Sequence, residues 1–282
     1  MLALALLFFA GWLLPLPAQS QPFPRAVIQQ RSQQVDQLFN WYYAAVYGTG
    51  VYRVGEETVG VLRAPFGYRL REAGEDQWGW RLTVPTTAAL AEFDLDDFNL
   101  GKVHAAGLSV LPGVEAEIPL ASGWMLKPFA NVGGGWDFEH SGSALIYSMG
   151  ATVVNYAYRD NGWRTMLGGR LTFAGYKSGD EGSRLGALSA GGGVDIPVDF
   201  QVAGRATLVG VQMTGTVYFN RLEFLLPSSP EKQVLGEAEI ALTLGVRKSF
   251  EFMGASFDRV GLGFRRGSDG LKGLRLVGSF PF

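Results

Sequence analysis

The sequence contains no cysteine, little charge and no apolar run long enough for a helix that crosses a membrane. Without cysteine there can be no disulfide framework, no thiolate metal site and no lipidated cysteine. Charged residues make up 18% of the 282 residues, and 24 basic side chains against 26 acidic ones give a formal net charge of −2. This balance provides neither a basic footprint for nucleic acid nor an acidic tail. We therefore expect no nucleic-acid partner.

Glycine and aromatic residues are abundant instead. The chain has 39 glycines, 13% aromatic and 47% hydrophobic residues, and glycine is used at roughly twice its average frequency. Such a chain is too apolar to be disordered, and its glycines are spread too evenly for a linker. The length suits one or two soluble domains or a single β-barrel of moderate size.

The first segment has the pattern of an export signal. Residues 2–16 form an apolar, proline-bounded stretch that is too short to span a bilayer core of about 30 Å. The small residues Ala18 and Ser20 suit signal peptidase cleavage before Gln21. We predict a signal peptide over residues 1–20. A short N-terminal anchor that is never cleaved is the alternative.

An amphipathic helix is predicted within residues 21–47. From Arg25 to Val46, apolar residues recur at steps of three and four, and glutamines fill much of the remainder. Gly48 and Gly50 follow as stop signals. The polar side is rich in amides and lacks the row of Lys and Arg that is typical of a membrane-surface helix.

Beyond the helix the period becomes two. Leu171 and Phe173 share one face of a predicted strand, whereas Arg170 and Thr172 share the other. Several such runs extend for 11 to 17 residues, which exceeds the usual strand length of about five or six and matches tilted membrane crossings. A soluble antiparallel sandwich, which also alternates, is the alternative.

Twelve alternating runs can be placed over residues 48–282. Their connections mostly alternate between short turns, such as Asp160-Asn161-Gly162 and Val198-Asp199-Phe200, and longer loops, as the two rims of a barrel require. We predict an all-β fold, an antiparallel transmembrane β-barrel of about 12 strands with both ends on one rim and the N-terminal α-helix in or below the lumen. The predicted strands cover 48–54, 58–71, 77–90, 104–120, 124–137, 143–159, 162–176, 184–197, 201–225, 235–249, 256–266 and 271–282.

The end of the chain alternates up to a terminal aromatic residue. The pattern predicts Leu276, Phe280 and Phe282 on one face of the last strand. This resembles the C-terminal assembly signal of Gram-negative outer-membrane barrels, which implies the outer-membrane assembly machinery as a partner. We expect a cell outer membrane location, with contacts to the lipid bilayer and lipopolysaccharide.

The order of parts, a helix followed by twelve strands that end in Phe, resembles the translocator unit of autotransporters. The stretches Leu62–Arg71, Leu108–Glu115, Trp124–Ala130 and Asp258–Phe264 are similar to the family of solitary outer-membrane autotransporter β-barrels, over roughly Arg31–Phe282. The resemblance implies a translocator-like barrel without its own exported passenger, and it implies no substrate.

Candidate chemistry is sparse. His140 stands beside Ser141 in a predicted external loop, and some outer-membrane hydrolases use His with Ser. A lipid hydrolase acting through His140 is therefore an alternative, but no enzyme-family motif surrounds it, and we predict no enzyme. The cluster of Asp94, Asp96 and Asp97 lacks the glycine turn and distal Glu of a calcium loop. We predict no cofactor and no metal site.

Charged residues of both signs occupy the inward positions of the predicted barrel. They can line a water channel or lock together in salt bridges. We predict a monomer with a helix-occupied lumen of low conductance and a passive transport or structural envelope role. A helix packed below the barrel is one alternative, and a surface adhesion protein acting through loops Ala91–Val103 and Leu226–Gln233 is another. The predicted lumen-facing residues are Glu115, Glu117, Lys127, Arg164, Arg170, Asp195, Glu237, Glu239, Arg265 and Arg275.

Overall fold

The computed structural model describes residues 48–54, 57–91, 104–138, 142–202, 204–224, 232–252 and 255–282. All of them belong to one compact unit, Gln37–Phe282. The predicted signal peptide and the predicted N-terminal helix lie outside the described residues. Among the described residues, no helix has the length and apolar character to cross a membrane.

The described residues form strands joined mostly by short turns. Two single-turn 3-10 segments, Ala121–Gly123 and Ser268–Gly270, connect neighbouring strands. The strands are β1 (Gly50–Val54), β2 (Glu57–Arg71), β3 (Gly79–Ala91), β4 (His104–Val110), β5 (Gly113–Pro119), β6 (Trp124–Asp137), β7 (Gly142–Tyr158), β8 (Arg164–Ser178), β9 (Glu181–Val202), β10 (Arg205–Phe224), β11 (Lys232–Phe252), β12 (Ala255–Gly267) and β13 (Lys272–Val277).

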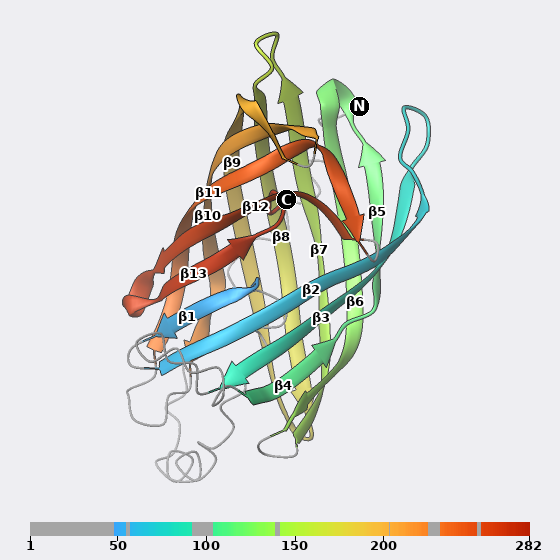
Figure 1. The fold of residues 1–282 in the computed structure, drawn as a ribbon. Coiled ribbons are helices and arrows are strands. Elements are labelled where there is room, and N and C mark those ends of the chain that lie inside the picture. Colours follow the sequence, from blue (N-terminus) through green and yellow to red (C-terminus); the bar gives the residue numbers. More distant parts are fainter. Residues whose placement is uncertain are drawn as a thin grey trace. The chain divides into compact units, whose positions relative to one another are not determined.

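These strands close into one antiparallel barrel (Figure 1). Strands adjacent in the wall pair antiparallel, and β1 pairs with β13 over Gly50–Arg53 to close the wall. The two short strands β4 and β5 are halves of a single wall strand, because both pair with β3 and with β6. The wall therefore has the 12 strands that the sequence predicts.

The break between β4 and β5 falls at Leu111 and Pro112, where proline has no N–H to donate. Hydrogen bonds nevertheless continue on both sides of it. The Leu111 N–H donates to the carbonyl of Pro85, and the Val132 N–H donates to the carbonyl of Pro112, each over 3.0 Å. The wall stays continuous through the break.

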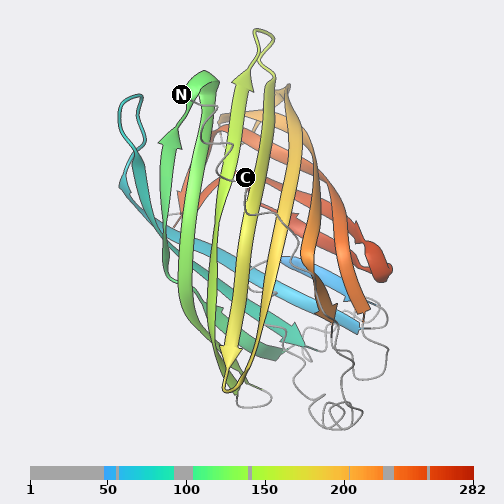
Figure 2. The ribbon, with the colours of Figure 1, turned by 180° about the vertical axis from the view of Figure 1, so that it is seen from behind.

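Alternation places apolar side chains outside and charged side chains inside. In β8, Leu167 is 55% exposed on the outer face, whereas the preceding residue, Met166, is 1% exposed on the inner face. Arg164 and Arg170 share the inner face with Met166 and line the lumen. Figure 2 shows β6–β9 side by side as long ribbons with closely aligned axes, which together form one side of the wall.

One predicted turn is wrong. The stretch Val198-Asp199-Phe200 continues β9, which ends at Val202, and the turn before β10 includes Gly204 instead. Gly204 has a φ of +72°, a conformation that glycine adopts at no steric cost. Val198 and Phe200 lack this freedom, and Asp adopts such a φ only occasionally. The strand predicted over 201–225 is consequently Arg205–Phe224.

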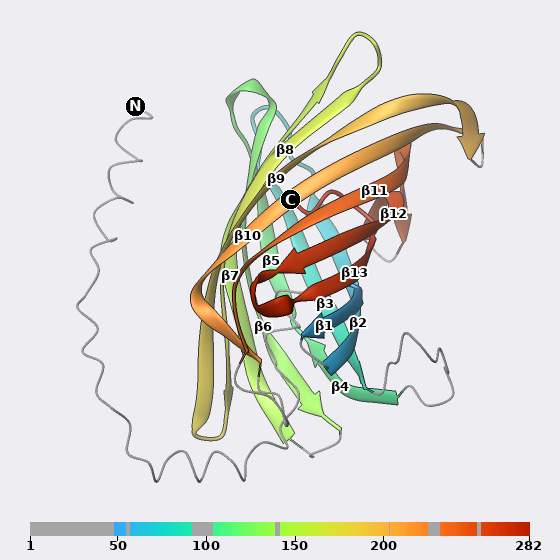
Figure 3. The same cartoon turned by 90° about the vertical axis from the view of Figure 1, so that its left-hand side faces the viewer.

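The last strand is also shorter than predicted. It ends at Val277, and residues Gly278–Phe282, named here the C-terminal strap, turn inward and line the lumen. The chain end lies within the outline of the barrel in both perpendicular views (Figures 1 and 3). Leu276 is 55% exposed on the outer face, whereas Phe280 and Phe282 are 5% and 6% exposed. The three residues therefore do not share a face.

Candidate functional site

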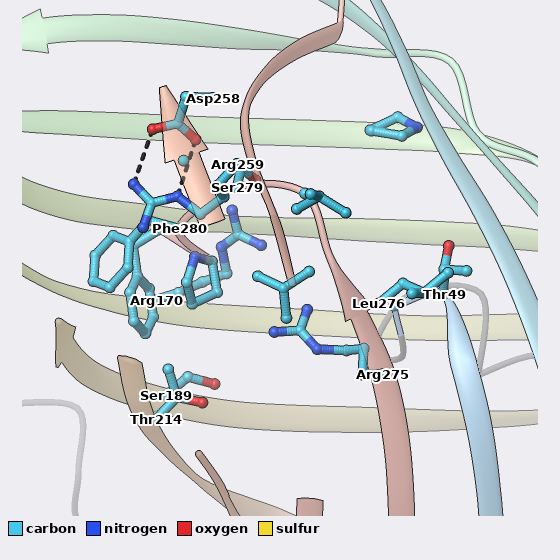
Figure 4. A pocket seen from close by; sticks show the side chains of 18 of the residues that line it. Thr49, Arg170, Ser189, Thr214, Asp258, Arg259, Arg275, Leu276, Ser279 and Phe280 are labelled. Carbon is cyan, nitrogen blue, oxygen red and sulfur yellow. Dashed lines mark hydrogen bonds and ion pairs between the residues drawn. The ribbon is translucent and has the colours of Figure 1, made fainter. Parts of the chain in front are cut away.

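The lumen holds a cavity of about 1120 Å³ whose wall is rich in charged and hydroxyl groups (Figure 4). All but three of the predicted inward charges line it directly. Asp195 and Glu239 are buried and hydrogen-bonded to these lining residues. Glu117 lies two positions from Glu115 along β5 and hence on the same face. The lining members are Glu115, Lys127, Arg164, Arg170, Glu237, Arg265 and Arg275.

Four of the lumen charges form a first ion network, with two cations and two anions. Arg164 of β8 donates from Nε to Asp195 of β9 over 2.7 Å, and from Nη2 to Asp258 of β12 over 2.9 Å. Arg259 donates from Nη1 to Asp195 over 3.1 Å and from Nη2 to Asp258 over 2.9 Å. Because β8 and β12 are four places apart in the wall, these bonds cross part of the lumen and link strands that do not pair with each other.

Sequence reasoning missed Asp258 and Arg259. Arg259 has the same inward parity as Arg265, so alternation alone was sufficient to find it. Asp258 has outward parity and nevertheless contacts Arg164. Asp258 lies where the pairing of β11 with β12 shifts between Gly245 and Phe250, and the sequence carries no clear signal for such an irregularity.

A second network of two cations and two anions lies near the junction of the first and last strands. Arg265 pairs with Glu237 over 2.8 Å and with Glu239 over 3.1 Å. Arg275 of β13 donates from Nε to Glu239 of β11 over 2.8 Å. It reaches across β12 at Gly263, the residue opposite Arg275 in the register. A Cβ on Gly263 would lie 3.0 Å from the Glu239 carboxylate, so glycine leaves this path open.

Tyr52 joins the second network to β1. Its ring lies under the Arg265 guanidinium, with 5.6 Å between Cζ and the ring centroid, and its hydroxyl donates to the carbonyl of Gly48 over 2.8 Å. A guanidinium over an aromatic face is electrostatically attracted to it. The short strand β1 is thus held to the barrel by side chains as well as by its ladder.

The C-terminal strap occupies part of the lumen. Phe280 and Phe282 pack with Val154 of β7 and Met166 of β8 in one apolar cluster. The two rings meet edge to face, with 5.3 Å between centroids, an arrangement that aromatic pairs prefer. The helix predicted as the lumen occupant lies outside the described residues. The strap was not foreseen as an occupant.

The groups that carried the other predictions lie mostly outside the described residues. These include His140, the aspartates at 94, 96 and 97, and the loop residues 92–103 and 225–231. Within the part of the chain that the structure describes, no three His, Cys, Asp or Glu side chains are grouped to hold a metal ion.

Comparison with known proteins adds no family assignment. The chain matches no protein-family model, and no curated protein is similar to it. Function must therefore be argued from the barrel, its two faces and its lumen.

Proposed function

We propose that the protein is an integral outer-membrane β-barrel whose outer face is solvated by lipid. The observation that carries this proposal is the continuous apolar outer surface of the described strands. Monomeric soluble proteins rarely expose apolar patches larger than a few hundred Å², whereas a lipid-facing barrel wall requires them. Exposed side chains on this surface include Leu62, Leu145, Leu167, Phe173, Met213, Ile240, Leu242, Leu262 and Phe264.

Strand length and aromatic placement support the proposal. From β6 to β12 the strands have 13 to 22 residues, more than the roughly 9–11 that a tilted transmembrane strand needs. Trp78, Trp80 and Trp163 are exposed at or beside the turns of one rim. Tryptophan there is typical of the interfacial girdles of membrane barrels.

The physiological role that fits best is a passive structural or transport component of the envelope, without enzymatic activity. Two charge-balanced networks and the C-terminal strap occupy part of the lumen, beside the cavity of about 1120 Å³, which favours low conductance over an open pore. With 12 strands, β1 begins and β13 ends on the side of the same rim, and this rim faces the periplasm in the proposed orientation. Lipopolysaccharide and the outer-membrane assembly machinery are the proposed partners of a monomer resembling an autotransporter translocator.

Heat modifiability and a lipid-face charge test the proposal together. The protein should fractionate with outer membranes, and unboiled and boiled samples should migrate differently in detergent gels. Leu262→Arg near the middle of β12 should weaken folding into vesicles by about 2–4 kcal/mol, whereas Leu262→Ala should cost less. Recovery as a soluble species, or equal stability of these two variants in vesicles, would contradict a lipid-facing wall.

A further inference from the structure

We propose that Lys127 and Arg170, with Thr152 between them as the support of Arg170, form a binding site for a phosphate-type anion on the lumen wall. The three residues stand in one transverse row, because Lys127 of β6 pairs with Thr152 of β7, and Thr152 pairs with Arg170 of β8. Both cationic side chains line the cavity. Strands two places apart are separated by about 10 Å, a span that Lys and Arg side chains can close around one anion. The inference rests on the barrel fold and not on its membrane location.

Arg170 differs from the arginines of the two ion networks. Its Nε donates to the Thr152 hydroxyl over 2.8 Å, but no carboxylate of the described residues lies within ion-pairing distance of its guanidinium. Its two Nη groups have no described hydrogen-bond partner. A partly buried cation without a counterion is less well compensated than the arginines of the networks, and a paired set of guanidinium N–H donors matches the oxygens of a phosphate.

The guanidinium is held in place by a packed support. The Phe129 ring lies against it, with 5.4 Å from Cζ to the ring centroid. Phe129 in turn lies over Gly150, its cross-strand partner, where a Cβ would come within 2.9 Å of the ring. Gly150 therefore makes room for Phe129, and Phe129 orients Arg170. This arrangement is preorganised, so little side-chain entropy would be lost on binding.

Lys127 supplies the second positive charge. Within the described residues its ammonium group makes no hydrogen bond and no ion pair, although Glu115, Glu117 and Arg81 lie within electrostatic range. Arg63 lies within electrostatic range of Arg170. The neighbourhood of the row thus holds four cations and two carboxylates, a surplus of two positive charges. The strap lies beside it, because Phe282 packs on Gly168, the next inward position to Arg170 along β8.

Titration calorimetry of the folded full-length protein in detergent with inorganic phosphate tests the site. Wild type should bind saturably, and Arg170→Gln should weaken binding at least about tenfold, the effect expected for a lost charge-assisted contact. Lys127→Gln should weaken binding as well, and Glu115→Gln should tighten it. Lys177→Gln removes a charge from the same strand at an exposed position and should leave binding unchanged.

A second arm replaces inorganic phosphate with phosphatidylglycerol in mixed micelles, to distinguish a free anion from a lipid headgroup. Binding that depends on Arg170 in either arm supports the site, and the arm in which it occurs shows whether the bound phosphate group is a free anion or a lipid headgroup. Absence of such binding in both arms overturns the proposal. If Arg170→Gln does not fold, as judged by heat modifiability, the opposite shifts expected for Lys127→Gln and Glu115→Gln decide it, and equal affinities of these two variants overturn it.

Discussion

The side chain of Phe282 lies directly over Gly168, so closely that a Cβ on Gly168 would be 2.5 Å from the Cβ of Phe282. No larger residue fits at position 168 while the strap keeps its place. Val154 and Met166 complete the apolar seat. The strap is therefore a specific occupant of the lumen, and its seat on β7 and β8 is shaped to receive the end of the chain.

Displacing the strap should open the lumen. Gly168→Leu would put a side chain where Phe282 packs, and we expect a clear rise in single-channel conductance in planar bilayers, toward that of a chain lacking residues 278–282. Gly169→Leu is the matched control, because a Cβ there meets only ordinary van der Waals neighbours. Equal conductance of wild type, Gly168→Leu and the truncated chain would show that the strap does not limit passage.

The free energy of unfolding should fall strongly when the first ion network loses one carboxylate. Asp195 accepts hydrogen bonds from both Arg164 and Arg259, and the Arg259 side chain is fully buried. Asp195→Asn leaves two arginines with Asp258 alone, and breaking a buried pair in this way costs about 3–5 kcal/mol. Equilibrium urea unfolding should show this loss. Asp199→Asn, exposed on the same strand, should change the free energy of unfolding little.

The second network should show strong coupling between two strands that are not adjacent. A double-mutant cycle with Glu239→Gln and Arg275→Gln should give a coupling energy of about 0.5–3 kcal/mol, because the side chains share partly buried hydrogen bonds. The exposed pair Arg69–Glu72 is the control and should couple by less than about 1 kcal/mol. Additive effects of the two substitutions on the free energy of unfolding would mean that this pair does not stabilise the barrel near the β1–β13 pairing.

Alternation explains why the wall could be predicted. Leu167 and Met166 face opposite sides of β8 because consecutive strand residues do so, and the same parity puts Arg164 and Arg170 in the lumen. The register of each strand is strongly specified when one face is apolar and the other charged, since a slip of one residue would exchange the two faces. Strand positions and inward charges therefore follow from local pattern.

The strap could not be predicted in this way. Parity treats Phe280 and Phe282 like Leu276, and only contacts with Val154 and Met166, more than a hundred residues earlier, distinguish them. Pro281 is a weak local sign, since it cannot donate to a ladder. Asp258 escaped prediction as well, because it contacts Arg164 despite its outward parity, at a point where the pairing of β11 with β12 shifts. Positions set by tertiary contact or by a bulge leave no period in the sequence.

The reversal between β9 and β10 supplies the last prediction. Gly204 has a φ of +72°, and a residue with a Cβ pays roughly 1–2 kcal/mol in this left-handed region. Gly204→Ala should therefore lower the free energy of unfolding by about that amount. Gly215→Ala in β10 is the control, because its Cβ would meet only the Glu237 carbonyl oxygen, at 3.9 Å, and should be close to neutral. Equal stability of Gly204→Ala and wild type in urea unfolding would place the turn elsewhere, with Val198-Asp199-Phe200 the nearest alternative.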